Sequence, residues 1–116
     1  MNYNNILELL LIEFPELEKE MLENDNLHDL PHCFFDIIFV PYISNACKEK
    51  KELLSKVGDF LEQMAICSDI KVKELLNVSV LEPLVLERNV TPVLCKYLKK
   101  ETIGELQFWE ERYNNR

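Results

Sequence analysis

Three acidic residues stand inside otherwise apolar stretches of the sequence, where paired carboxylates could carry out acid–base chemistry. They are Asp36 in FFDIIF, Glu62 in FLEQM and Glu82 in VLEPL. If the flanking helices form a hairpin at residues 68–69, Glu62 and Glu82 differ in height by roughly 10 Å and are not a close pair. We predict instead that all three are buried structural acids. Their partners would be backbone N–H groups at a helix start, a tyrosine hydroxyl or an arginine, and Arg88 is near Glu82 in the sequence.

A second cluster, His28, His32 and Cys33, has residue types that could bind a metal ion or act in nucleophilic catalysis. Two histidines four residues apart share one face of a helix, but Pro31 interrupts this stretch, and no fourth ligand follows at a zinc-binding spacing. A Cys–His dyad that uses Cys33 stays open, because dyads are assembled in space. The sequence has no GxSxG serine motif and no glycine-rich phosphate loop. We expect no catalytic residue, no metal and no cofactor.

Helices must position these residues, because the composition disfavours strands joined by hairpins. The chain has 116 residues, a length that suits one domain over residues 1–116. It has only two glycines, and no Asn-Gly or Asp-Gly pair that could form a tight hairpin turn. Leu, Glu and Lys, which favour helices, are abundant. We predict an all-α domain, a compact bundle of six or seven helices, for which a HEAT-like stack of antiparallel helix pairs is one arrangement.

Apolar residues at intervals of three and four, together with prolines and capping residues, give the expected helix limits. The predicted helices cover residues 4–13, 15–23, 31–50, 51–67, 70–81, 92–98 and 101–113. Pro15 and Pro92 suit first helical turns, where a backbone N–H has no partner to lose. Pro41 is expected to kink its helix. The sequence leaves open whether the helix that begins at Ile70 continues past Pro83.

Charge is distributed unevenly along the chain. The net charge is −8, and residues 1–30 contribute −7 of it, from eight acids and one lysine. This disfavours nucleic acid and anionic membranes as partners, which require clustered Lys and Arg. It permits a basic protein partner, while a solvated face that keeps the protein soluble is the simpler interpretation. The acids expected on a contact face are Glu16, Glu18, Glu20, Glu23, Asp25 and Asp29.

Cysteine usage and hydropathy indicate the compartment. The four cysteines have no CxxC pair and each lies beside apolar residues, so we expect them to be reduced and buried in a cytoplasmic protein. Glu8 and Glu13 interrupt the apolar part of the N-terminal stretch, which therefore does not resemble a signal peptide. No uncharged run approaches the roughly 20 residues that a membrane helix needs.

Several segments follow one another in an order typical of one family. FPELEKE comes first, then PY at positions 41 and 42, then DFLEQMA, VSVLEPL and FWEERY. In these segments the chain resembles a family of small, uncharacterised, all-helical bacterial domains that occur singly. Such domains are similar to immunity proteins, which are encoded beside secreted toxins and block one cognate toxin. The resemblance implies a non-enzymatic protein that binds and neutralises a toxin, and a basic nuclease domain would suit the acidic surface.

Two other functions stay open. One is a HEAT-like structural or adaptor module that holds a peptide or a partner helix in a groove. The other is an enzyme that uses the internal acids or the cluster of His28, His32 and Cys33. An exposed apolar groove would favour the adaptor, and side chains that converge in an open pocket would favour the enzyme.

Overall fold

Helices form nearly the whole of this structure, a computed structural model that describes residues 1–27, 29–87 and 89–114. No strand occurs in those three ranges, so the all-α prediction is confirmed. In chain order the elements are α1 (Ile6–Glu13), η1 (Pro15–Leu17), α2 (Glu18–Glu23), η2 (Asp25–Leu27), α3 (Pro31–Phe34), η3 (Phe35–Phe39), α4 (Val40–Glu49), η4 (Lys51–Leu53), α5 (Leu54–Ala65), α6 (Ile70–Leu76), η5 (Asn77–Leu81), α7 (Glu82–Val85), α8 (Thr91–Leu94) and α9 (Lys100–Asn114). The segments η1, η2 and η4 are short 3₁₀ turns, whereas η3 and η5 are π-helical.

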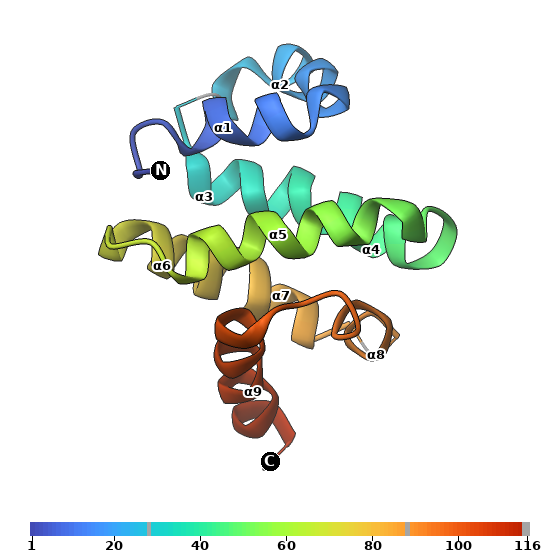
Figure 1. The fold of residues 1–116 in the computed structure, drawn as a ribbon. Coiled ribbons are helices and arrows are strands. Elements are labelled where there is room, and N and C mark those ends of the chain that lie inside the picture. The colour runs from blue at the N-terminus through green and yellow to red at the C-terminus, as the bar shows by residue number, and fades with distance from the viewer. Residues whose placement is uncertain (28, 88, 115–116) are drawn as a thin grey trace.

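The elements are layered from the N-terminal to the C-terminal end of the molecule (Figure 1). The N-terminal layer, defined as α1, η1 and α2, lies at one end, and α9 lies at the other. Between them lie α5 and two long helices. One long helix consists of α3, η3 and α4 end to end, and the other consists of α6, η5 and α7. The first of these continuous stretches agrees with the predicted helix 31–50, whereas the second runs to Val85, beyond the predicted range 70–81. The predicted helix 92–98 is shorter in the structure, where α8 ends at Leu94.

Both long helices contain a π-helical segment just before a proline. The segment η3 precedes Pro41, and η5 precedes Pro83. Proline cannot donate a backbone hydrogen bond, and its ring clashes with the carbonyl four residues earlier, which here belongs to Ile37 or Ser79. A wider turn at that carbonyl admits the ring without ending the helix. The helix that begins at Ile70 therefore continues past Pro83, and the two π segments pack against each other.

Aromatic rings join the N-terminal layer to the middle of the molecule. The ring centroid of Phe14 lies 5.4 Å from that of Phe39 and 5.9 Å from that of Phe60. The rings of Phe39 and Phe60 are 6.2 Å apart and nearly perpendicular, an arrangement that aromatic quadrupoles favour. All three side chains are buried. This cluster fixes the layer of α1 and α2 against η3 and α5.

Gly58 lets α5 approach another backbone closely. A Cβ atom placed on Gly58 would lie 2.0 Å from the carbonyl oxygen of Tyr97, a distance that no real side chain tolerates. The other glycine, Gly104 in α9, has no neighbouring atom within 4 Å of such a Cβ. The contact at Gly58 brings the segment before α9 directly onto α5.

The cysteines are reduced, as predicted, but only two are buried. Cys47 and Cys67 are buried, whereas Cys33 and Cys95 are half-buried, and all four are free thiols. Within the described part of the chain, no helix is long and apolar enough to cross a membrane.

Candidate partner-binding surface

The N-terminal layer turns its apolar side inward and its acids outward. Leu10, Phe14 and Leu17 are buried against the core. Helical periodicity then places the intervening glutamates on the opposite side. Five glutamates of this layer are exposed at one end of the molecule: Glu8, Glu13, Glu16, Glu18 and Glu23.

The structure separates the six acids predicted for a contact face into groups. Glu16, Glu18 and Glu23 are exposed, and Glu20 is half-buried beside a groove. Asp29 is exposed but lines a different hollow, beside Tyr3. The side chain of Asp25 lies outside the described part of the chain.

The groove runs between α2 and the long helix that contains η3. It has a volume of about 290 Å³ and is lined by Leu17, Glu20, Ile37, Ile38, Pro41 and Tyr42. Ile37 is 55% exposed, which is unusual for a large apolar side chain in a hollow. Leu22, on α2, is 70% exposed and extends the apolar surface of the layer. Apolar side chains rimmed by charged residues are typical of a surface that binds another protein.

A hydrogen bond from the hydroxyl of Tyr42 to the carboxylate of Glu16 joins the layer to the wall of this groove. Partial burial raises the pKa of Glu16, but the bond from Tyr42 and the positive charges of Lys56 and Lys50 outweigh it, so the net shift is downward. Burial and the bond to Glu16 raise the pKa of Tyr42 well above its ordinary value. At neutral pH Glu16 is therefore a carboxylate and Tyr42 a phenol, so the negative charge beside the groove is permanent.

This arrangement can bind a partner that has an apolar side chain for the groove and cations for its rim. The exposed part of Ile37 offers a contact area, and Glu16, Glu18 and Glu20 offer charge. Acids at such a rim steer the approach of a cationic partner and set its orientation.

The three acids predicted to be buried have three different environments. Asp36 is exposed, so the prediction for it is wrong. Its neighbours Phe35 and Phe39 point into the core, and a residue next to Phe35 is turned about 100° away around the helix axis. Glu62 and Glu82 are half-buried rather than buried.

Glu62 and Glu82 are bonded to partners of the predicted kinds. Glu62 accepts hydrogen bonds from the backbone N–H of Thr102 at 3.0 Å and of Glu101 at 3.2 Å, at the start of α9. Glu82 accepts a hydrogen bond from the hydroxyl of Tyr113. Arg88, the other predicted partner of Glu82, lies outside the described residues. Both acids therefore hold α9 in place.

A comparison of the sequence with models of protein families gives a match over most of the chain. Residues 7–114 match the model of a domain of unknown function, DUF7674. The chain belongs to the DUF7674 family. No curated protein matched the chain, and no solved structure matched it.

In this DUF7674 domain the structure describes two members of the predicted metal-binding cluster, His32 and Cys33. His28 lies outside the described residues, and among the residues that are described no group of three His, Cys, Asp or Glu could hold a metal ion. His32 shares a hydrogen bond of 2.6 Å with the hydroxyl of Ser79, and its other ring nitrogen lies 3.9 Å from a carboxylate oxygen of Glu74. Ser79 is buried within η5. The contact therefore ties α3 to η5.

The apolar half of the DUF7674 groove was not expected from the sequence. Ile37 and Ile38 lie in an aromatic and β-branched run that suggests a buried element. The one available signal is Asp36, since an acid beside Ile37 indicates that this side of the helix reaches solvent.

Proposed function

We propose that this DUF7674 domain is a non-enzymatic immunity protein, which binds a cognate bacterial toxin domain through its acidic N-terminal layer and so neutralises it. The observation that carries the proposal is the groove beside α2, which the exposed Ile37 lines together with Glu20 and with Tyr42, the hydrogen-bond partner of Glu16. The order of segments that resembles immunity-type domains supports the same function.

The surface also indicates the chemistry of the toxin. A basic domain, such as a nuclease that must itself bind phosphates, carries Lys and Arg that complement exposed glutamates. A large apolar side chain at the centre of that basic surface would enter the groove, where it is shielded from water by the charged rim. Occupation of the toxin's cationic surface would block its substrate.

The experiment is a binding measurement with the purified product of the neighbouring gene, in its inactive form, at several salt concentrations. We expect tight binding whose association rate falls as salt rises. The triple variant Glu18→Lys, Glu20→Lys and Glu23→Lys should slow association by about tenfold or more. The matched control reverses three acids of α9 at the other end of the molecule, Glu105, Glu110 and Glu111. Equal effects of the two triple variants would refute this contact face.

A second pair of variants tests the groove. Ile37→Asp should weaken binding by about thirtyfold, since a central apolar contact contributes about 2 kcal/mol. Ile66→Asp is the control, because Ile66 is 62% exposed at the end of α5, outside the groove. Both variants should keep the helical circular dichroism of the wild type, because neither side chain is buried.

An adaptor that holds a peptide or partner helix in the same groove is the alternative function, and the same exposed Ile37 supports it. The two functions differ in their effect on the partner. An immunity protein abolishes the activity of its toxin at a one-to-one ratio, whereas an adaptor leaves the activity of its partner intact.

A further inference from the structure

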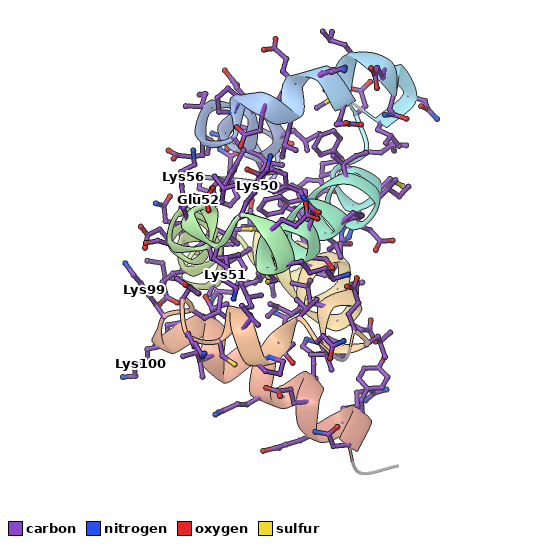
Figure 2. The ribbon with its side chains drawn as sticks, turned by 90° about the vertical axis from the view of Figure 1, so that its right-hand side faces the viewer. Lys50, Lys51, Glu52, Lys56, Lys99 and Lys100 are labelled. Carbon is purple, nitrogen blue, oxygen red and sulfur yellow. The ribbon has the colours of Figure 1, made fainter. Side chains whose placement is uncertain are left out.

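A cluster of lysines lies on one side of the molecule, beside the acidic N-terminal layer. The lysine cluster consists of Lys50, Lys51, Lys56, Lys99 and Lys100 (Figure 2). The first three come from the turn between α4 and α5 and the first turns of α5, and the last two from the segment that leads into α9. All five are exposed. The close contact between Gly58 and Tyr97 brings these two parts of the chain together.

Most of this positive charge is not neutralised by a neighbouring carboxylate. Lys99 forms an ion pair of 2.8 Å with Asp59. In the described ranges, Lys50, Lys51 and Lys100 have no close ion pair. The ammonium group of Lys56 lies 4.9 Å from the ring centroid of Phe14, a cation–π contact. The cluster is therefore free to attract an anionic surface.

The lysine cluster adjoins the acidic N-terminal layer. Phe14, which Lys56 covers, directly follows Glu13 at the end of α1. Lys56 and Lys50 are also close enough to Glu16 to lower its pKa. Two surfaces of opposite sign thus meet at a boundary on one molecule, with cations on α5 and acids on α1 and η1.

The residues of the cluster suit a protein better than a nucleic acid. Its cations are all lysines, which lack the bidentate geometry with which arginine binds phosphate. Glu52 and Asp59 stand among them and would repel a uniform polyanion.

We propose that the lysine cluster binds the acidic N-terminal layer of a second copy of this chain, in a two-fold symmetric dimer. A positive patch and a negative patch that lie side by side are self-complementary under a two-fold axis. In such a dimer the lysines of each copy face the acids of the other copy. Contacts between exposed charges are individually weak, so the dimer is a low-affinity one that salt dissociates. The inference needs no toxin, and its test uses the protein alone.

The experiment is sedimentation equilibrium of the purified chain at about 20 mM and about 500 mM salt, which change the screening length severalfold. We expect dimer at low salt and monomer at high salt. The lysine-reversed variant, Lys50→Glu with Lys51→Glu, should be monomeric at both. So should the acid-reversed variant, Glu13→Lys with Glu18→Lys.

Mixing the two reversed variants gives the decisive result. One then presents acids on both patches and the other presents lysines on both, so the mixture should form a heterodimer at low salt although neither variant dimerises alone. Lys71→Glu with Lys73→Glu, on exposed lysines of α6, is the charge-matched control and should dimerise like the wild type.

Three outcomes would overturn the proposal. One is a wild-type chain that stays monomeric at low salt, and another is a mixture that forms no heterodimer while each variant keeps its helical circular dichroism. The third is a monomeric wild type whose lysine cluster binds a labelled DNA duplex, which would assign the cluster to nucleic acid instead.

Discussion

The carboxylate of Glu62, on α5, accepts hydrogen bonds from both the backbone N–H and the hydroxyl of Thr102, at 3.0 and 2.9 Å. The first N–H groups of a helix have no partner within that helix. Here a side chain that is 40 positions away in the sequence supplies the acceptor at the start of α9. The last helix is therefore positioned by α5 rather than by a capping residue of its own.

Removing this carboxylate should destabilise the fold. Glu62→Ala leaves the N–H groups of Glu101 and Thr102 without an acceptor, and we expect a loss of about 1–3 kcal/mol in the free energy of unfolding by urea. Glu52→Ala is the control, since Glu52 is exposed and should change stability by less than about 0.5 kcal/mol. Equal losses in the two variants would contradict the assigned role of Glu62.

The same contact predicts a dependence on pH. Partial burial raises the pKa of Glu62. The hydrogen bonds from Thr102 and Glu101 and the positive charge of Lys99 lower the pKa by more than burial raises it, so the net shift is downward. A group whose pKa is lower in the folded state stabilises the protein above its unfolded pKa of about 4.3 and loses that contribution as pH falls through the folded value. The stability difference between the wild type and Glu62→Gln should therefore narrow from about pH 5 to about pH 3, measured by urea unfolding at each pH. A difference that stays constant over this range would contradict the shift.

The two glycines should respond in opposite directions to the same substitution. Gly58→Ala places a Cβ atom 2.0 Å from the carbonyl oxygen of Tyr97, so backbone must move, and we expect a loss of about 2 kcal/mol or more. Gly104→Ala meets no atom within 4 Å and removes a flexible residue from α9, so it should stabilise the protein by about 0.5–1 kcal/mol. Thermal unfolding of both variants is the measurement. A stable Gly58→Ala protein would show that α5 and the Tyr97 backbone are not in contact.

Trp109 anchors α9 on η5 through its ring N–H, which donates to the side-chain oxygen of Asn77 at 2.9 Å. Trp109→Phe removes the donor and part of the ring, and we expect a loss of about 1–2 kcal/mol in urea unfolding. Phe108→Leu tests the adjacent ring, which is 55% exposed, and should be nearly neutral. The reverse ranking would mean that α9 docks by its other side.

The phenol of Tyr42 should ionise at an unusually high pH. Burial and the bond to the carboxylate of Glu16 both favour the neutral phenol, so its pKa lies well above the ordinary value of about 10. Titration of phenolate absorbance should show a late step that is absent in Tyr42→Phe and moves to lower pH in Glu16→Gln. A Tyr42→Phe protein that loses its phenolate absorbance change at about pH 10 rather than at higher pH would argue against this contact.

Helix starts could be predicted from the sequence because local residues determine them, whereas the ends at Val85 and Leu94 differ from those predicted. Pro15 and Pro31 begin η1 and α3, and Pro92 is the second residue of α8, since proline fits where no N–H partner is needed. The gap between α5 and α6 follows from Asp69, whose carboxylate accepts a hydrogen bond from the N–H of Lys71 at 3.0 Å.

The hydrogen-bond partners of Glu16 and Glu62 could not be predicted, because they come from distant parts of the chain. Thr102 bonds to Glu62 across the bundle, and Tyr42 bonds to Glu16 from another helix. The groove beside Ile37 likewise depends on how α2 lies over η3. An acid in an apolar stretch needs hydrogen-bond donors, so the sequence predicted that Glu62 and Glu82 would be hydrogen-bonded. It did not identify Thr102 and Glu101 as the donors to Glu62.

The π segments keep two rows of core residues in phase. Buried residues recur at every fourth position in both long helices: Phe35, Phe39, Ile43 and Cys47 in one, and Val72, Leu76, Val80 and Leu84 in the other. In an uninterrupted α-helix of 3.6 residues per turn, such a row drifts around the axis by about 40° at each step. A π turn holds more residues and absorbs that drift, so the row stays on the core side. Deleting one residue from η3 or η5 would rotate every later side chain of that helix by about 100° around its axis. Half of the row would then face water. The lengths of η3 and η5 are therefore constrained independently of their composition.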